Sequence, residues 1–387
     1  MDNKDKVIRK ERDISVELLR IVGCLIVIGV HTCLSAYVNG VYDKSRLFMS
    51  CFFADGVAIF WLIMGFFLFR SSSYKAAAKR SAKGILLPLA LITVFLFYFE
   101  GFLLGGESLS QSLHASPEEY KLAFMTLLTW RNPIGSAYHL WYLYVYMLVI
   151  LIFPVLKAFA DYLDQDIKRA EAFMLISLAL LVLNDITNNR LLSCSHDSIN
   201  GLFPAAIEVL WGHIIYRYRK ELTRSFSPIA GLSALFGFFL LNYVRMSIEL
   251  YRGSIGETNY ILYWFSSFGL LCALCMAVMA FVLGRHIKGS LSRSLILRLG
   301  RDTFIIYLIH LTIAGLLGRF GISYRIDSFL GSHLGIGPAY ELSINLAIIF
   351  VVFLIGLVIA ELFFGLRYAV CRRLRGGNHG PVSPQDP

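Results

Sequence analysis

The sequence predicts an all-α, polytopic membrane protein with about ten transmembrane helices and both chain ends in the cytoplasm. Of its 387 residues, 57% are hydrophobic and only 16% are charged, whereas about 25% of the residues of a soluble domain are charged. Apolar segments long enough to cross a bilayer recur along the whole chain. The strongly basic loops between them all fall on one side of the membrane if the chain crosses it ten times.

The N-terminal part predicts a cytoplasmic tail and the first two spans. Residues 1–13 carry five basic residues, which the positive-inside rule keeps in the cytoplasm. The first span is predicted at residues 14–38 and the second at residues 48–69. The loop at residues 70–84 holds five basic and no acidic residues, so it returns the chain to the cytoplasmic side.

The third span is predicted at residues 85–104 and is followed by a longer outer segment. That segment contains a half-apolar stretch at residues 120–130, which predicts an interfacial helix. The fourth span begins near Tyr138 with a cluster of aromatic residues of the kind found at membrane interfaces. The remaining spans are predicted at residues 172–187, 202–218, 228–246, 260–283, 303–320 and 342–366.

The loops on the two sides differ in charge. The basic ones, predicted to be cytoplasmic, contain Lys168 and Arg169 or lie at residues 217–224, 285–301 and 367–375. The loops predicted outside carry fewer positive charges and lie at residues 188–200, 247–258 and 321–340. Residues 14–366 are therefore predicted to be a single membrane domain, with residues 367–387 as a cytoplasmic C-terminal tail.

Charge and cysteine content argue against several function classes. Lys and Arg exceed Asp and Glu by 36 − 26 = 10. Because this excess lies in loops beside apolar spans, it indicates orientation and contact with anionic membrane lipids rather than nucleic-acid binding. Cys272 and Cys275 form a CxxC motif inside an apolar run without a neighbouring His or Lys, so we expect no metal site and no disulfide framework. The sequence has no P-loop and no GxGxxG motif.

The first span carries an arginine and a histidine on one face. Arg20 and His31 are eleven residues apart, and eleven steps of about 100° make three turns plus about 20°. At 1.5 Å per residue they lie about 16 Å apart along the axis, with Arg20 at the membrane edge and His31 near mid-bilayer. An ionisable residue at that depth is a functional candidate. An arginine paired with Glu17 and a histidine bonded to a neighbouring helix would also explain the pattern.

A second histidine lies within the ninth predicted span. His310 follows Tyr307 by about one helical turn, so the two share a face. Asp302 or Thr303, after Gly300, is expected to be the N-cap at which this helix starts. Tyr307 and His310 are candidate site residues, or they form hydrogen bonds to a neighbouring helix.

Other polar residues leave two interpretations open. His139, Trp141 and Tyr142 lie at the outer end of the fourth span, as site residues or as part of an aromatic belt. Basic residues of the loop at 70–84 either set the orientation or bind a phosphorylated cofactor. The residues concerned are Arg70, Lys79, Arg80 and Lys83. Acidic residues inside spans must be paired, protonated or facing water, and these are Asp55, Glu208 and Glu361.

Taken together, these segments resemble the acyltransferase-3 family of multi-pass membrane acyltransferases. The resemblance rests on five blocks in order: Arg20 and His31 separated by ten residues, GVAIFWLIMGFFLF at 56–69, KGILLPL with Pro88, HLWYL at 139–143 and FIIYLIH at 304–310. Ten spans are also usual in the family. Residues 64–65 depart from the family pattern, because Met-Gly stands where Ser-Gly is common.

The resemblance implies transfer of an acyl group, usually acetyl from acetyl-CoA, to a hydroxyl of a glycan or lipid-linked saccharide at a bacterial plasma (inner) membrane. In that picture His31 is the base or acyl relay, and Glu17, at a position that is often acidic in the family, joins it as a catalytic candidate. Arg20 and the basic loop would hold the CoA phosphates. The further site candidates are His139, Trp141, Tyr142, Tyr307 and His310.

Two other functions compete with acyl transfer. Ten helices with buried polar residues also fit a transporter of small, amino-acid-like solutes, and a scaffold role in polysaccharide assembly is a third reading. The sequence shows no inverted repeat and no matching pair of Gly/Pro-broken spans, which favours the enzyme. No hydrolase-like domain is expected beyond the membrane domain, so that domain or a partner completes the transfer. A homo-oligomer is compatible with the sequence.

Overall fold

The structure is a computed structural model that describes residues 12–33, 36–38, 41–71, 73–187, 191–192, 200–220, 228–255, 266–335 and 337–374. Within this part the chain forms helices and one short hairpin, in which Tyr37–Val38 (β1) pairs antiparallel with Val41–Tyr42 (β2). The predicted all-α class is confirmed. Predictions for residues 1–11, 375–387, 188–190, 193–199 and 221–224, and for the first residues of the span at 260–283, lie outside the described residues.

The helices of the first half are α1 (Ile14–Thr32), α2 (Lys44–Phe52), α3 (Gly56–Leu68), α4 (Tyr74–Ser81), α5 (Leu87–Glu100), α6 (Leu109–Ser112), α7 (Pro117–Leu128) and α8 (Trp141–Leu151). Those of the second half are α9 (Phe153–Leu163), α10 (Ile167–Ile186), α11 (Leu202–Arg217), α13 (Pro228–Ser254), α14 (Ser267–His286), α15 (Ser290–Arg319), α16 (Ile322–Leu334) and α17 (Pro338–Leu374). Two π-helical segments, η1 (Ala82–Leu86) and η2 (Gly101–Gly105), flank α5, and a 3-10 segment, η3 (Gly135–Leu140), leads into α8.

Seven helical stretches of the described chain are long and apolar enough to cross a bilayer. They are α1, α2 with α3, α4 through η2, α13, α14, α15 and α17. An eighth is the pair η3–α8 and α9, which bends by 71° where Pro154 opens α9. A helical, multi-pass membrane protein is thus confirmed, while the count of ten spans and the N-in orientation stay predictions.

The two further predicted spans coincide with α10 and α11. α10 carries Lys168, Arg169 and Glu171 near its start, which lowers its hydropathy. α11 has only 16 residues, and most of them are buried against other helices. The predicted interfacial helix at residues 120–130 coincides with α7, and its position at an interface stays a prediction.

The predicted start of the ninth span is wrong. α15 begins at Ser290, so Asp302 and Thr303 lie inside the helix rather than at its N-cap. Gly300 has another reason to be glycine: a Cβ there would lie 2.3 Å from Oε2 of Glu17 on α1. The glycine therefore lets α1 and α15 approach closely.

Two predicted outer loops contain helix. α13 continues to Ser254, into the loop predicted at residues 247–258. α16 occupies most of the loop predicted at residues 321–340. Both segments mix polar and apolar residues, so a search for continuous apolar runs does not detect them.

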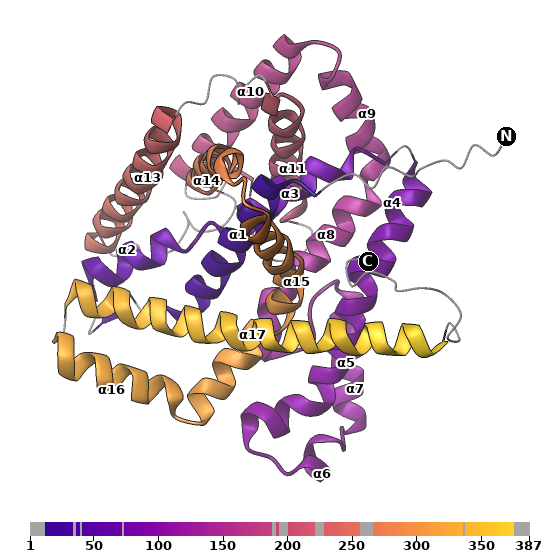
Figure 1. Ribbon diagram of the computed structural model, residues 1–387, viewed down its shortest axis with the longest axis vertical. Helices are drawn as coiled ribbons and strands as arrows, with labels where there is room; N and C mark the ends of the chain where they lie inside the picture. Colours follow the sequence, from indigo (N-terminus) through magenta and orange to yellow (C-terminus); the bar gives the residue numbers. More distant parts are fainter. Residues whose placement is uncertain are drawn as a thin grey trace.

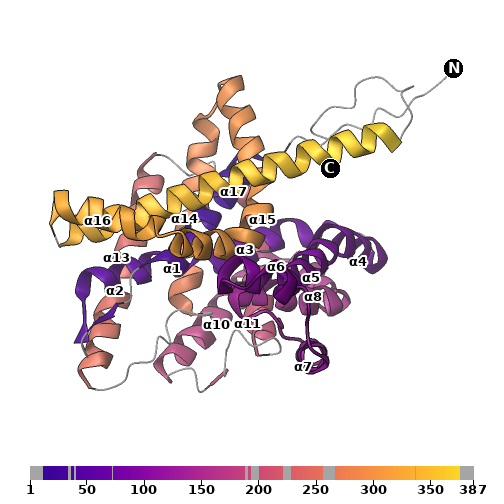
Figure 2. The same cartoon turned by 90° about the horizontal axis from the view of Figure 1, so that it is seen from below.

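The interior of the bundle is formed by α1, α3, α11, α14 and α15, and α16 and α17 lie along one side (Figures 1 and 2). α3 and α11 make a close contact through a glycine on each helix. A Cβ on Gly65 would lie 2.0 Å from the backbone oxygen of Val209, and one on Gly212 would lie 2.2 Å from that of Leu62. Small residues at such a crossing allow the backbones to meet without a side chain between them.

α1 and α15 run side by side in the same direction. Their contacts advance together along both chains: Glu17 lies against Gly300, Sγ of Cys24 reaches the backbone oxygen of Thr303 at 3.8 Å, and the ring of His31 lies near that of His310. This pairing places Glu17 beside Gly300, ten residues into α15, and brings the two histidines together. His31 lies in the last turn of α1, because the helix ends at Thr32 and not at residue 38 as predicted.

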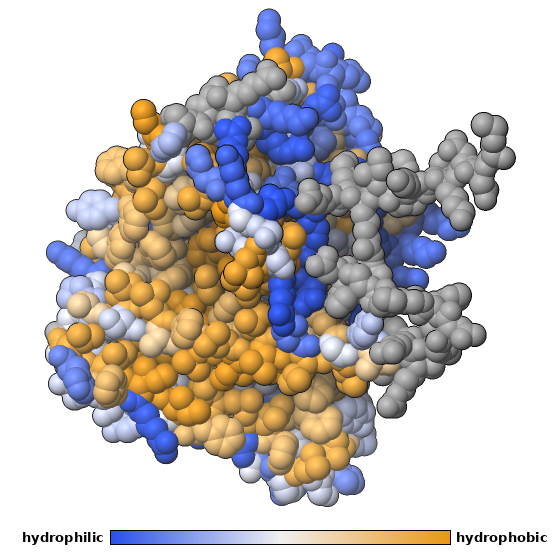
Figure 3. Space-filling view, in the orientation of Figure 1, coloured by the Kyte–Doolittle hydropathy of each residue, from blue (hydrophilic) through white to orange (hydrophobic). Residues whose placement is uncertain are grey.

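The outer surface fits a lipid environment. Large apolar side chains on α5 and α13 are exposed, including Leu91, Val94, Leu232 and Phe236. Figure 3 shows hydrophobic residues over much of the lower half of one face and hydrophilic residues gathered toward its top. Exposed apolar area of this extent indicates contact with a membrane.

Candidate active site

Two cavities lie along the same face of α1. The larger, of about 330 Å³, is bordered by α1, α3, α4, η1, α8 and α15 and is lined by Arg20. The smaller, of about 20 Å³, is lined by His31. Arg20 and His31, which are predicted to lie about 16 Å apart on one helix face, therefore each line one of the two cavities.

Three arginines from three helices line the larger cavity, and each is held by a neighbour. Arg20 on α1 pairs with Glu17 at 3.2 Å. Arg80 on α4 donates to Oγ of Ser71 at 2.7 Å. Arg301 on α15 pairs with Asp302 at 2.7 Å and Glu361 at 2.8 Å. Because these contacts already hold the guanidinium groups in place, the binding of an anion costs little further side-chain entropy.

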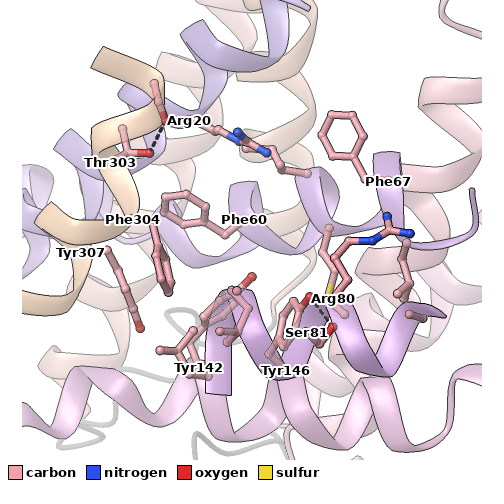
Figure 4. Close-up of a pocket in the computed structure, with 18 of the residues that line it drawn as sticks. Arg20, Phe60, Phe67, Arg80, Ser81, Tyr142, Tyr146, Thr303, Phe304 and Tyr307 are labelled. Atoms are coloured by element: carbon pink, nitrogen blue, oxygen red, sulfur yellow. Dashed lines mark hydrogen bonds between the residues drawn. The ribbon is translucent and has the colours of Figure 1, made fainter. Parts of the chain in front are cut away.

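Aromatic rings and hydroxyls make up much of the remaining lining. Phe60, Phe67 and Phe304 supply apolar faces, and Tyr142 and Tyr146 come from α8. Figure 4 shows Arg20 and Arg80 on two sides of the same space, with Tyr307 and Phe304 at one end of it. Gly84 and Ile85 of the π-helical segment η1 also reach the cavity. Such π segments are frequent at functional sites.

Three histidines converge around the smaller cavity. His31 and His139 line it together with Trp141, and His310 packs against both rings. The ring centroids of His31 and His310 are 5.3 Å apart, those of His139 and His310 4.4 Å, and those of His31 and His139 6.2 Å. In the described part of the chain, no group of three or more His, Cys, Asp or Glu residues has the geometry to hold a metal ion.

The hydrogen bonds of two histidines fix their tautomers. Nε2 of His139 and Nδ1 of His310 both donate to the backbone oxygen of Tyr307, at 3.1 and 2.7 Å. In the neutral rings the lone pairs therefore lie on Nδ1 of His139 and Nε2 of His310. Within the described part of the chain, both of these atoms are buried without a hydrogen-bond partner. They are acceptors available to a group that enters the histidine cluster.

His31 has a different partner. Its Nδ1 lies 3.0 Å from the hydroxyl of Tyr138, and that hydroxyl can either donate or accept. If Tyr138 accepts, the lone pair of His31 lies on Nε2, the arrangement that a general base requires. Tyr138 is 54% exposed, so it connects the buried histidine cluster with the surface.

Several predicted site residues lie outside the two cavities. Glu17 is buried between Arg12, at 2.6 Å, and Arg20. It is 14 residues from His31, or about 21 Å along α1, so its place suits a residue that orients Arg20. Arg70 stacks on Phe67 and Tyr216 at 4.6 and 4.5 Å and does not line the larger cavity.

The loop at residues 70–84 contributes one of its basic residues to the lining of the larger cavity. Of its four candidates, Arg80 lines the cavity, whereas Lys79 and Lys83 are exposed and are not among the lining residues. Trp141 and Tyr142, adjacent in sequence, serve different cavities: Trp141 lines the histidine one and Tyr142 the arginine one.

Arg301 is the main lining residue that the sequence does not single out, because a basic loop at residues 285–301 also fits a role in membrane orientation. A signal was present, since Arg301, Phe304 and Tyr307 recur every three residues on one helix face, and all three line the larger cavity.

The acidic residues left open by the sequence have distinct environments. Asp55 forms a buried ion pair with Arg245 at 2.8 Å. Glu361 pairs with Arg298 and Arg301. Glu208 is 1% exposed and its Oε2 has no hydrogen-bond partner in the described structure.

Comparison with known proteins gives one match. The model of the acyltransferase-3 family, described as an acyltransferase domain, matches residues 13–364, which is nearly the whole chain. Neither the curated proteins nor the solved structures contain a match.

Proposed function

The chain belongs to the acyltransferase-3 family of membrane acyltransferases, and on that premise we propose that it transfers an acetyl group from acetyl-CoA to a hydroxyl of a glycan or lipid-linked saccharide. The observation that carries the proposal is the pair of cavities along α1, one lined by arginines and the other by histidines. The first suits an anionic donor, and the second suits proton transfer. We place this reaction at the bacterial plasma (inner) membrane.

The larger cavity fits the donor. CoA carries phosphate groups, and arginine forks match phosphate oxygens in geometry and charge. Arg20, Arg80 and Arg301 offer three such forks around one space. The aromatic lining offers faces on which the adenine base can stack. The three basic residues outside the cavity contribute at most to the positive electrostatic potential around it, and they are Arg70, Lys79 and Lys83.

The smaller cavity supports acetyl over longer acyl groups. Its volume of about 20 Å³ is near that needed to hold one water molecule. Its apolar lining by Val27, Val30 and Val57 leaves little room beside the histidines. A two-carbon acyl group demands the least rearrangement there.

In the proposed reaction His31 acts as general base. The acceptor hydroxyl gives its proton to His31 while its oxygen bonds to the acyl carbon. The carbon–sulfur bond then breaks, and the proton passes from His31 to the departing thiolate, which yields the ester and free CoA. The unpaired nitrogens of His139 and His310 lie in the same cluster, and because the reacting hydroxyl gives its single proton to His31, they remain acceptors for other hydroxyls of the saccharide.

The experiment is release of free CoA from acetyl-CoA by purified protein, with and without a glycan-lipid extract. Wild type should release CoA, and His31→Ala should lower turnover about a hundredfold or more, because a positioned base contributes about that much. The variant must unfold at the wild-type temperature in detergent. Normal turnover by such a variant removes His31 from the mechanism. An absence of CoA release with every acceptor, together with uptake of a small solute into vesicles, would establish a transporter instead.

A further inference from the structure

Tyr307 stands between the two cavities. Of all the described residues that line them, it is the one that borders both. Its side chain is 5% exposed, and its ring packs near those of Phe60 and Tyr142, with centroids 6.2 and 6.0 Å away. Figure 4 shows Tyr307 beside Phe304 at the end of the arginine-lined space.

A reciprocal pair of hydrogen bonds fastens Tyr307 to His139. The hydroxyl of Tyr307 donates to the backbone oxygen of His139 at 2.6 Å. The ring of His139 donates from Nε2 to the backbone oxygen of Tyr307 at 3.1 Å. The two bonds join α15 to η3, two segments that are 168 residues apart in the chain. Tyr307 is therefore fixed in place by its hydroxyl as well as by packing.

From this arrangement we propose that Tyr307, fastened to His139, is a partition between the donor cavity and the histidine cavity and sets the upper size of the acyl group that reaches His31. The inference rests on the proposed acyl transfer. When the phosphates of an acyl thioester lie among the arginines, its acyl end must pass Tyr307 to reach His31 in the other cavity. A bulky ring admits a short acyl group more readily than a long one, and it also shields the thioester from water on the acceptor side.

The test compares acyl-CoA donors of two, four and eight carbons with wild type and Tyr307→Ala. Removing the ring should raise the turnover of the four-carbon donor relative to acetyl-CoA by about tenfold, because that is the discrimination one or two methylenes commonly confer. Hydrolysis of acetyl-CoA without acceptor should rise at the same time. Tyr307→Phe keeps the ring but loses the bond to His139, so we expect wild-type acyl preference with increased hydrolysis.

Controls keep the outcomes distinct. Tyr324→Ala, on α16 and 74% exposed, faces neither cavity and should keep the wild-type profile. Tyr307→Leu replaces Tyr307→Ala if the alanine variant does not fold. A folded variant with wild-type acyl preference and unchanged hydrolysis overturns the partition while acyl transfer by wild type stands. If wild type releases CoA from none of the donors, the proposed function fails, and the partition fails with it.

Discussion

At the scale of single residues, the helical period predicted one part of the site and not the other. Arg20 and His31 belong to one helix, so their common face follows from their spacing, and each lines a cavity on that face. The convergence of His139 and His310 on His31 depends on how η3, α1 and α15 pack together. No local pattern encodes that packing, so the sequence identifies these histidines only as separate candidates.

Arg20 is expected to act on donor binding. The variant Arg20→Ala lacks charged hydrogen bonds to the donor that are worth roughly 1.5–3 kcal/mol each. The KM for acetyl-CoA should therefore rise about tenfold or more. The KM for the acceptor should change less than about twofold, because the acceptor does not reach this cavity. Initial-rate kinetics with each substrate varied in turn provide the measurement. A larger effect on the acceptor KM would move Arg20 away from the donor.

Substitutions of Arg301 and Lys79 test whether the donor is bound by the residues that line the cavity or by those that the sequence suggests. Arg301 lines the arginine cavity, whereas Lys79 is exposed outside it. Arg301→Ala should therefore raise the donor KM about tenfold, and Lys79→Ala, which also removes one positive charge, should leave it nearly unchanged. The same kinetic assay serves both variants. Equal effects would mean that the phosphates are held by the general field of the basic loop rather than by the cavity.

At the scale of helices, continuous apolar runs predicted the cores of the spans and missed their ends. α15 extends N-terminally to Ser290 through a polar segment, and α16 is helical although it mixes polar and apolar residues. Hydropathy reports where a helix enters lipid, not where its hydrogen bonding begins. The sequence around Gly300 predicts a helix start at Asp302 or Thr303, because the close packing of Gly300 against Glu17 cannot be seen in one sequence.

The crossing of α3 and α11 gives a stability prediction. In Gly212→Ala the new Cβ would lie 2.2 Å from the backbone oxygen of Leu62, so the two backbones must separate. Overpacking of this kind costs about 1–3 kcal/mol, and thermal unfolding in detergent should occur at a lower temperature. Gly365→Ala on α17, where nothing lies within 4 Å, is the matched control and should unfold at the wild-type temperature or above. Equal unfolding temperatures for both variants would contradict the close contact.

At the scale of the whole molecule, the direction of α1 and α15 constrains the topology without fixing the number of spans. The two helices run in the same direction, as two odd-numbered spans do. α15 is the seventh span if the eight stretches of the described chain are counted, and the ninth if α10 and α11 are added. Because α10 and α11 enter as a pair, they change the count by two and leave the direction of every later helix unaltered. Arg20 and Arg301 therefore face the same side under either count.

That side is predicted to be the cytoplasm, where acetyl-CoA is made, and the prediction can be tested directly. An impermeant thiol reagent should label Lys75→Cys, on the exposed start of α4, only after the membrane is permeabilised. It should label Glu118→Cys, on α7, in intact cells. The parent protein, with its native cysteines, gives the background. Labelling of Lys75→Cys in intact cells would indicate that the arginine cavity faces outward. A cytoplasmic acyl-CoA could then no longer be its ligand.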